Sequence, residues 1–166
     1  MPLPLEQIYD DHADALYAFL LNCSRDQTLI QDALQEVFLK LARSPSLLEK
    51  ARDPRRFLLR TAHNALRDLA RRSCTRTAYK EMLSVQSPTL LAPLFPSDDD
   101  AFRLAVESAL RDLPQEQRGV LHLKLWENLT FAQIGESLEI SPHTAASRYR
   151  YALEKLRNAL RPVYEE

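Results

Sequence analysis

Arginine is the residue type in this sequence whose number and spacing most clearly point to a chemistry. Residues 55–80 hold eight basic side chains and one acidic side chain. At about 100° per residue, a helix beginning near Pro54 would gather six polar or basic side chains within an arc of about 100°. They are Arg56, Arg60, His63, Asn64, Arg67 and Arg71. Guanidinium groups clamp phosphates and amides pair with base edges, so this face predicts nucleic-acid binding, with a solvated helix face as the alternative.

A second polar face follows near the C-terminus, in a pattern of helix, tight connection and helix. Residues 130–138 read TFAQIGESL, residues 139–141 read EIS, and residues 142–160 read PHTAASRYRYALEKLRNAL. The side of the last helix expected to pack inward holds Ala145, Tyr149, Ala152, Leu153 and Leu156. The opposite side, near the helix start, holds His143, Thr144, Ala146, Ser147 and Arg150. Short polar groups followed by arginine suit the DNA major groove, although other two-helix corners carry weaker versions of this pattern.

A third candidate surface is acidic rather than basic. Over residues 24–43, an apolar stripe predicts a helix packed on one side, with Leu29, Ile30, Ala33, Leu34, Val37, Phe38 and Leu41. The other side holds Asp32, Gln35, Glu36, Leu39 and Arg43. A face of carboxylates and amides with one exposed leucine fits a partner protein, and a merely solvated face is the alternative.

Composition excludes several other chemistries. The four histidines are dispersed along the chain, and Cys23 and Cys74 have no partner at metal-binding spacing, so we predict no metal site, no catalytic set and no cofactor. Two glycines in the whole chain leave nothing from which to build a phosphate-binding loop. No apolar run approaches the roughly 20 residues of a membrane span, and the acidic start is unlike a secretory signal. We therefore expect a cytoplasmic protein that is not an enzyme.

The elements that would hold these surfaces are helices. Apolar residues recur at spacings of three and four on both sides of a segment between Met82 and Asp100, where prolines, serines and aspartates break the pattern. Net charge is −4 over residues 1–54, +7 over 55–80, −5 over 81–136 and +1 over 137–166. We predict an all-α protein with two small helical domains, 5–80 and 102–162, joined by a flexible linker, 81–101. The C-terminal domain would contain a helix-turn-helix.

Polar residues and prolines mark the expected helix starts. Two pairs match the capping box, Ser24 with Gln27 and Thr130 with Gln133. Three prolines are expected as first helical residues, namely Pro54, Pro114 and Pro142. The residues before the first and last of them, Asp53 and Ser141, are then the N-caps.

Taken in their order along the chain, the three surfaces resemble a bacterial RNA polymerase sigma factor of the extracytoplasmic-function type. Residues 32–43, DALQEVFLKLAR, resemble the region that grips core polymerase. Residues 53–72, DPRRFLLRTAHNALRDLARR, resemble the region that recognises and melts the minus-10 element. Residues 110–157 resemble the minus-35-binding domain. The likeness covers nearly the whole chain apart from the linker.

The resemblance implies roles for individual residues. Core-polymerase binding would fall to Asp32, Gln35, Glu36, Phe38 and Leu39. Minus-10 binding would fall to Arg56, Arg60, His63, Asn64, Arg67 and Arg71, which together form the cationic face. The loop 44–53 would help to hold a base turned out of the stack. Minus-35 binding would fall to His143, Thr144, Ala146, Ser147, Arg148 and Arg150. The implied partners are core RNA polymerase, promoter DNA and, as in many relatives, an anti-sigma factor.

Two turns depart from the family pattern. Asn128 and Glu139 stand where relatives usually have glycine. Asparagine tolerates a left-handed backbone, whereas glutamate adopts it at a cost of about 1 kcal/mol. We therefore expect the connection at Glu139 to be built differently.

The resemblance predicts a subunit that directs core polymerase to specific promoters and assists their opening. The alternative is a helix-turn-helix regulator whose N-terminal half is a sensor or an oligomerisation module. A third possibility is a helical adaptor with no role in nucleic-acid binding.

Overall fold

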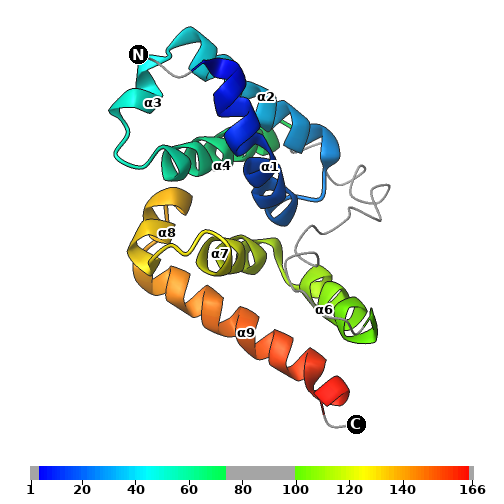
Figure 1. The fold of residues 1–166 in the computed structure, drawn as a ribbon. Coiled ribbons are helices and arrows are strands. Elements are labelled where there is room, and N and C mark those ends of the chain that lie inside the picture. Colours follow the sequence, from blue (N-terminus) through cyan, green and yellow to red (C-terminus); the bar gives the residue numbers. More distant parts are fainter. Residues whose placement is uncertain (1–3, 74–99, 165–166) are drawn as a thin grey trace. The chain divides into compact units, whose positions relative to one another are not determined.

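The structure, a computed structural model, describes residues 4–73 and 100–164, and all regular elements in these ranges are α-helices (Figure 1). The chain divides into two compact units, residues 1–87 and 88–166. None of the described helices is both long and apolar enough to cross a bilayer. The all-α expectation is confirmed. Cys74 and the predicted linker lie outside the described residues, except for Asp100 and Ala101, which open a helix.

The described part of the first unit contains four helices: α1 (Leu5–Cys23), α2 (Gln27–Arg43), α3 (Ser46–Lys50) and α4 (Pro54–Arg72). Helix α2 packs against α1 and α4, and the short α3 contacts α2 and α4. The fully buried large side chains of this core are Leu16, Phe19, Leu20, Ile30, Leu58 and Leu59. Residues 44–53, which we expected to form a loop, contain the short helix α3, and the buried side chain of Leu48 holds this helix against the core.

The start of α2 differs from the expected capping box. Asp26, rather than Ser24, is the N-cap, and its Oδ1 accepts hydrogen bonds from Thr28 N (3.0 Å) and Leu29 N (3.3 Å). The Ser24 hydroxyl is already used, because it accepts from Asp26 N at 3.1 Å. A carboxylate also suits the positive end of the helix dipole better than a hydroxyl. The predicted pairing of Ser24 with Gln27 is therefore wrong.

The start of α4 is as predicted. The Asp53 Oδ1 accepts from Arg56 N at 3.1 Å, and Pro54 is the first helical residue. From this start, the helical period of about 3.6 residues places the residues of the cationic face on one side of α4.

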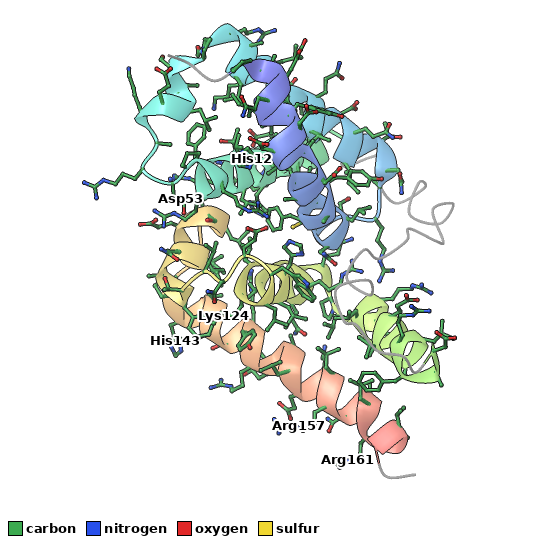
Figure 2. The ribbon with its side chains drawn as sticks, viewed as in Figure 1. His12, Asp53, Lys124, His143, Arg157 and Arg161 are labelled. Carbon is green, nitrogen blue, oxygen red and sulfur yellow. The ribbon has the colours of Figure 1, made fainter. Side chains whose placement is uncertain are left out.

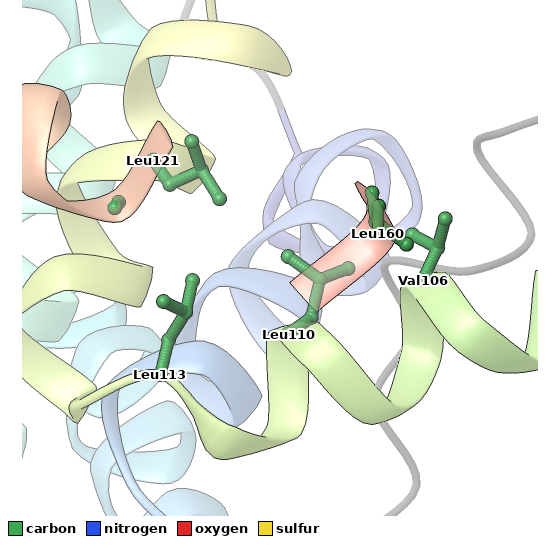
Figure 3. Close-up of a cluster of buried hydrophobic side chains, with 6 residues drawn as sticks. Val106, Leu110, Leu113, Leu121 and Leu160 are labelled. Atoms are coloured by element: carbon green, nitrogen blue, oxygen red, sulfur yellow. The ribbon is translucent and has the colours of Figure 1, made fainter. Parts of the chain in front are cut away.

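The second unit also contains four described helices: α6 (Asp100–Asp112), α7 (Gln115–Leu125), α8 (Phe131–Leu138) and α9 (Pro142–Tyr164). Helix α9 packs against the other three. Figure 3 shows part of the core, a buried cluster of Val106, Leu110, Leu113, Leu121, Ala152 and Leu160. Pro114 lies one residue before its expected position, as the N-cap of α7, and its carbonyl accepts from Gln117 N and Arg118 N.

The connection between α8 and α9 is tight. The Thr130 hydroxyl accepts from Gln133 N at 3.1 Å and the Gln133 side chain accepts from Thr130 N at 3.0 Å, so this capping box is confirmed. The Ser141 hydroxyl accepts from Thr144 N at 3.0 Å, as expected of a cap for α9.

Glu139 adopts the left-handed conformation between these helices, with φ 58° and ψ 44°. The expectation of a differently built connection is wrong. The Gly135 carbonyl accepts from the N–H groups of both Glu139 and Ile140, the second at 3.0 Å. A Cβ on Gly135 would lie 2.6 Å from the Ile140 carbonyl oxygen. The missing side chain lets the turn close over α8, and the two hydrogen bonds hold Glu139 in its strained conformation.

Candidate nucleic-acid interface

Helix α4 positions the predicted cationic face. Its apolar side, with Leu58, Leu59, Ala62 and Leu66, is buried in the first unit. Arg60 and Arg71 are exposed on the other side, whereas Arg56, His63, Asn64 and Arg67 are half-buried. The His63 ring lies 6.4 Å from the ring of Phe19 in α1, so this histidine also belongs to the packing between α1 and α4. The helix brings the six residues together, but its neighbours partly cover the middle of their face.

A pocket of about 620 Å³ lies at the start of α4. It is lined by residues of α1, α3 and α4 and of the connections next to α3, namely Ile8, His12, Pro45, Leu48, Glu49, Ala51, Arg52, Asp53, Pro54 and Arg55. The Nδ1 atom of His12 is buried and has no hydrogen-bond partner among the residues that the structure describes. Because an unsatisfied buried nitrogen is costly, it favours a ligand that can form the missing hydrogen bond. Figure 2 labels His12 and Asp53.

Sequence reasoning missed His12 as a site residue. The available signal was its position four residues after Ile8 and four before Leu16, both buried in α1. A polar side chain at a packed position of an amphipathic helix needs a partner or a function.

Helix α2 presents the acidic surface. Asp32, Gln35, Glu36 and Leu39 are exposed, and Phe38 is half-buried with its ring 5.0 Å from the ring of Tyr9. An apolar groove of about 360 Å³ runs beside them, lined by Leu5, Tyr9, Gln31, Leu34, Gln35, Phe38, Leu39 and Ala42. The structure thus brings the five predicted residues of α2 to one surface, and it adds Leu5 and Tyr9 from α1. These two exposed side chains could not be found from the periodicity of α2 alone.

Helix α9 presents the third surface. His143 and Arg150 are exposed near its start, whereas Thr144, Ala146, Ser147 and Arg148 are half-buried. The Ser141 hydroxyl donates to the Thr144 hydroxyl at 2.8 Å, so Thr144 is part of the helix cap. The Arg150 guanidinium carbon lies 5.5 Å from the centre of the Tyr151 ring.

The predicted inward side of α9 is packed as expected. Ala145 and Ala152 are fully buried, and Tyr149, Leu153 and Leu156 are half-buried against the core cluster. A capped helix, a tight turn and a second helix with an exposed polar start make the geometry by which a helix-turn-helix enters a major groove. Within residues 4–73 and 100–164, no cluster of His, Cys, Asp and Glu could hold a metal ion.

Two family models match the chain. Residues 8–75 match "Sigma-70 region 2", and residues 109–158 match "Sigma-70, region 4". The first segment contains the exposed face of α2 and the cationic face of α4, and the second contains the α8–α9 pair. Together the two matches cover well over half of the chain.

Curated relatives match over nearly the full length. The chain is 31% identical to the RNA polymerase sigma factor CarQ of Myxococcus xanthus over 155 residues, covering 93% of this chain and 88% of that one. It is 28% identical to the ECF RNA polymerase sigma factor SigL of Mycobacterium tuberculosis over 162 residues, covering 96% and 90%.

A solved structure shares the fold. It is the sigma factor RpoE of Bartonella quintana in complex with the anti-sigma factor NepR, with a TM-score of 0.68, 18% identity and coverage of 94% of this chain and 96% of that one. Together with the sequence matches and the two helical units, this likeness leads to one assignment. The chain belongs to the sigma-70 family and, within it, to the extracytoplasmic-function RNA polymerase sigma factors.

Proposed function

We propose that the two units of this sigma factor divide promoter recognition between them. Residues 5–80 bind core RNA polymerase and the minus-10 element, residues 102–162 bind the minus-35 element, and residues 81–101 join the two. The observation that carries this proposal is that an exposed acidic face and an exposed helix start fall in the segments matching regions 2 and 4, respectively. RNA synthesis belongs to the polymerase, so this chain acts in the cytoplasm as a specificity subunit and not as an enzyme.

The acidic face of α2 is the proposed polymerase-binding surface. Asp32, Gln35 and Glu36 supply charged and polar groups that fix orientation, and Leu39, which is 42% exposed, supplies apolar contact. Phe38, with its ring against Tyr9, would hold the floor of the contact. The family resemblance indicates the clamp helices of the largest core subunits as the partner.

The cationic face of α4 and the pocket at its start are the proposed minus-10 site. Arg56, Arg60, Arg67 and Arg71 would pair with backbone phosphates of the displaced strand, and His63 and Asn64 would add hydrogen bonds. A base turned out of the stack costs a few kcal/mol, which pocket contacts must offset. The unpartnered Nδ1 of His12 supports the pocket as the place for such a base.

The start of α9 is the proposed minus-35 site. His143 and Arg150 are exposed and can reach base edges in the major groove, and Thr144, Ala146, Ser147 and Arg148 would lie in or beside it. Binding both promoter elements through one polymerase-bound chain would raise the effective affinity for DNA that carries both.

The alternative function expected from the sequence was a DNA-binding regulator. A helix-turn-helix regulator with an N-terminal sensor is not favoured, because residues 8–75 match region 2.

An anti-sigma factor is a further proposed partner, for which the exposed Leu5, Tyr9 and Leu39 offer an apolar surface to cover. It would then compete with core polymerase, and adding core polymerase should release it.

Run-off transcription tests the proposed function. Core polymerase with this chain should initiate at defined sites on a genomic template library, and core polymerase alone should not. Initiation no better than with core polymerase alone would overturn the proposal.

Charge reversal tests the polymerase-binding surface. Glu36→Arg should abolish capture of core polymerase, because it places a cation in the centre of the α2 face. Asp14→Arg, an exposed charge reversal in α1, is the matched control and should leave capture unchanged. Equal loss in both variants would show that net charge, rather than this face, controls binding.

A substitution in α9 tests the division of work. Arg150→Ala should weaken holoenzyme binding to duplex promoter DNA about tenfold, as expected for the loss of one base-edge pair. The affinity for core polymerase should not change. A drop of the same size in both affinities would contradict the assignment of the two units.

A further inference from the structure

A groove of about 580 Å³ runs along α9 from Ala146 and Arg150, two of the residues proposed for the minus-35 site, toward the C-terminal end of the helix. It is lined by Phe131 at the start of α8 and by residues along most of α9, namely Ala146, Tyr149, Arg150, Leu153, Glu154, Arg157, Asn158 and Arg161. All of these residues belong to the second unit. Three of them are arginines and one is a carboxylate, so the lining carries a net positive charge.

The arginines lie on one side of the helix. Arg150, Arg157 and Arg161 follow His143 at spacings of seven, seven and four residues, which places all four side chains within about 40° of arc. Figure 2 shows His143, Arg157 and Arg161 along one side of α9. Arg157 and Arg161 are exposed, and neither forms an ion pair with any residue that the structure describes. The polar face at the start of α9 therefore continues as a row of free guanidinium groups.

Packed aromatic rings form the floor of this groove. The Phe131 ring lies 5.7 Å from the Tyr149 ring, and Lys124 Nζ lies 4.4 Å from the centre of the Phe131 ring. Lys124 also donates to the Leu129 carbonyl at 3.3 Å, which holds its ammonium group at the edge of the α8 start. Lys124 is thus a fourth cation beside the groove, and the packed rings keep the groove open.

The length of α9 decides what this row can reach. At 1.5 Å per residue, Arg157 lies about 10 Å and Arg161 about 16 Å along the helix from Arg150. The major groove of B-DNA is about 12 Å wide. When His143 and Arg150 are among the bases, Arg157 and Arg161 must lie at or beyond the groove edge, where the DNA presents backbone phosphates.

We propose that Arg157 and Arg161 form a phosphate-binding site for the DNA backbone flanking the minus-35 element. The proposal rests on the minus-35 role proposed above for the start of α9. The site is sequence-independent, because guanidinium groups at this distance meet phosphates rather than base edges. It would hold the second unit on DNA whatever bases lie under His143.

Salt dependence of DNA binding tests this site. Holoenzyme is bound to a 30-base-pair duplex that the wild-type holoenzyme has selected from a random-sequence pool, and affinity is measured across salt concentrations. Arg157→Ala with Arg161→Ala should reduce the slope of log affinity against log salt by about 1.8, since each phosphate contact contributes about 0.9. The preferred sequence should stay the same.

A matched control is available on the same helix. Lys155 is exposed but lies about 160° around α9 from Arg157, so Lys155→Ala removes one charge without touching the groove. Its salt slope should equal that of the wild type, whereas Arg157→Ala alone should lower the slope by about 0.9. Equal slopes for these two variants would overturn the proposal.

A variant that binds DNA more tightly than the wild type is also useful, because misfolding cannot explain a gain of affinity. Glu154 lines the groove four residues after Arg150 and three before Arg157. Glu154→Gln removes the one carboxylate of the lining and should raise affinity for duplex DNA several-fold at low salt. An unchanged or lowered affinity would count against a phosphate site.

Two further outcomes separate this site from the proposed function. If the arginine variants lose core-polymerase affinity while the salt slope is unchanged, the groove binds an acidic segment of the polymerase and the inference is wrong. If wild-type holoenzyme selects no sequence, the proposed minus-35 role fails. The slopes are then compared for the full chain on the unselected duplex pool, where a loss of about 1.8 still supports a phosphate site.

Discussion

The two helices proposed to bind DNA differ in what else their polar residues do. In α4, His63 lies against Phe19, and Asn64 and Arg67 are half-buried. In α9, His143 and Arg150 are exposed at the helix start, while the opposite side fills the core of the second unit. The comparison shows that His63 also takes part in packing in the first unit, whereas His143 and Arg150 in the second unit are exposed, although Thr144, Ala146, Ser147 and Arg148 are half-buried. Substitutions in α4 should therefore change stability and binding together.

The largest expected effect is in the first unit. Phe19→Ala removes a fully buried ring that supports α4 from α1, and should destabilise this unit by about 4 kcal/mol. Denaturation followed by unit-specific probes should show the first unit unfolding early and the second unchanged. Polymerase capture and minus-10 binding should be lost together. An equal shift in both units would show that they do not unfold separately.

The corresponding change in the second unit should be smaller. Gly135→Ala places a Cβ 2.6 Å from the Ile140 carbonyl oxygen, and should destabilise the α8–α9 connection by about 2–3 kcal/mol. Glu136→Ala, an exposed neighbour in α8, is the control and should have little effect. The measurement is the melting of the second unit together with duplex binding. Normal duplex binding at normal stability would contradict the tight connection.

Relief of backbone strain should raise the free energy of unfolding rather than lower it. Glu139→Gly should stabilise the second unit by about 1 kcal/mol, because glycine adopts the left-handed conformation without a Cβ penalty. Asn128 also has a positive φ, 54°, but asparagine tolerates it, so Asn128→Gly should stabilise less. Chemical denaturation measures both. A larger gain at Asn128 would reverse this account of the two turns.

The smallest expected effect compares a histidine of α4 with a histidine of α9. His63→Ala removes a ring packed against Phe19 and should destabilise the first unit by about 0.5 kcal/mol. His143→Ala removes an exposed ring and should leave the second unit's stability unchanged. Both variants should bind DNA more weakly. Equal stability changes would mean that the two helices do not differ as described.

Much of the fold follows from local sequence patterns. The apolar periodicity of α2 and α9 predicted which sides pack, and Asp53, Thr130 and Ser141 predicted three helix starts. The cap of α2 was missed because Ser24 and Asp26 are both good capping residues two positions apart, and only the three-dimensional turn decides which one faces the free N–H groups. The backbone at Glu139 was missed because it depends on Gly135, four residues away, rather than on its own preference.

The candidate surfaces were predictable only as far as one helix extends. The residues of the α2 face could be found because they share one amphipathic helix. The groove beside them also needs Leu5 and Tyr9 of α1, and the pocket at the start of α4 needs His12 of α1. The way in which separate helices meet is set by tertiary packing, which periodicity within one helix does not encode.

The length of α9 has a mechanical consequence. One end is anchored on α6 through Leu160, Val106 and Leu110, and the other end carries His143. The helix is about 34 Å long and packs against α7 and α8 as well as α6, so the helices of the second unit tilt together with it. A tilt of about 5° at the anchored end would move the far end by about 2–3 Å, the scale that separates a formed hydrogen bond from a broken one. A tilt that begins at α6 would thus weaken the proposed contacts of His143 with DNA without any change in the side chains that make them.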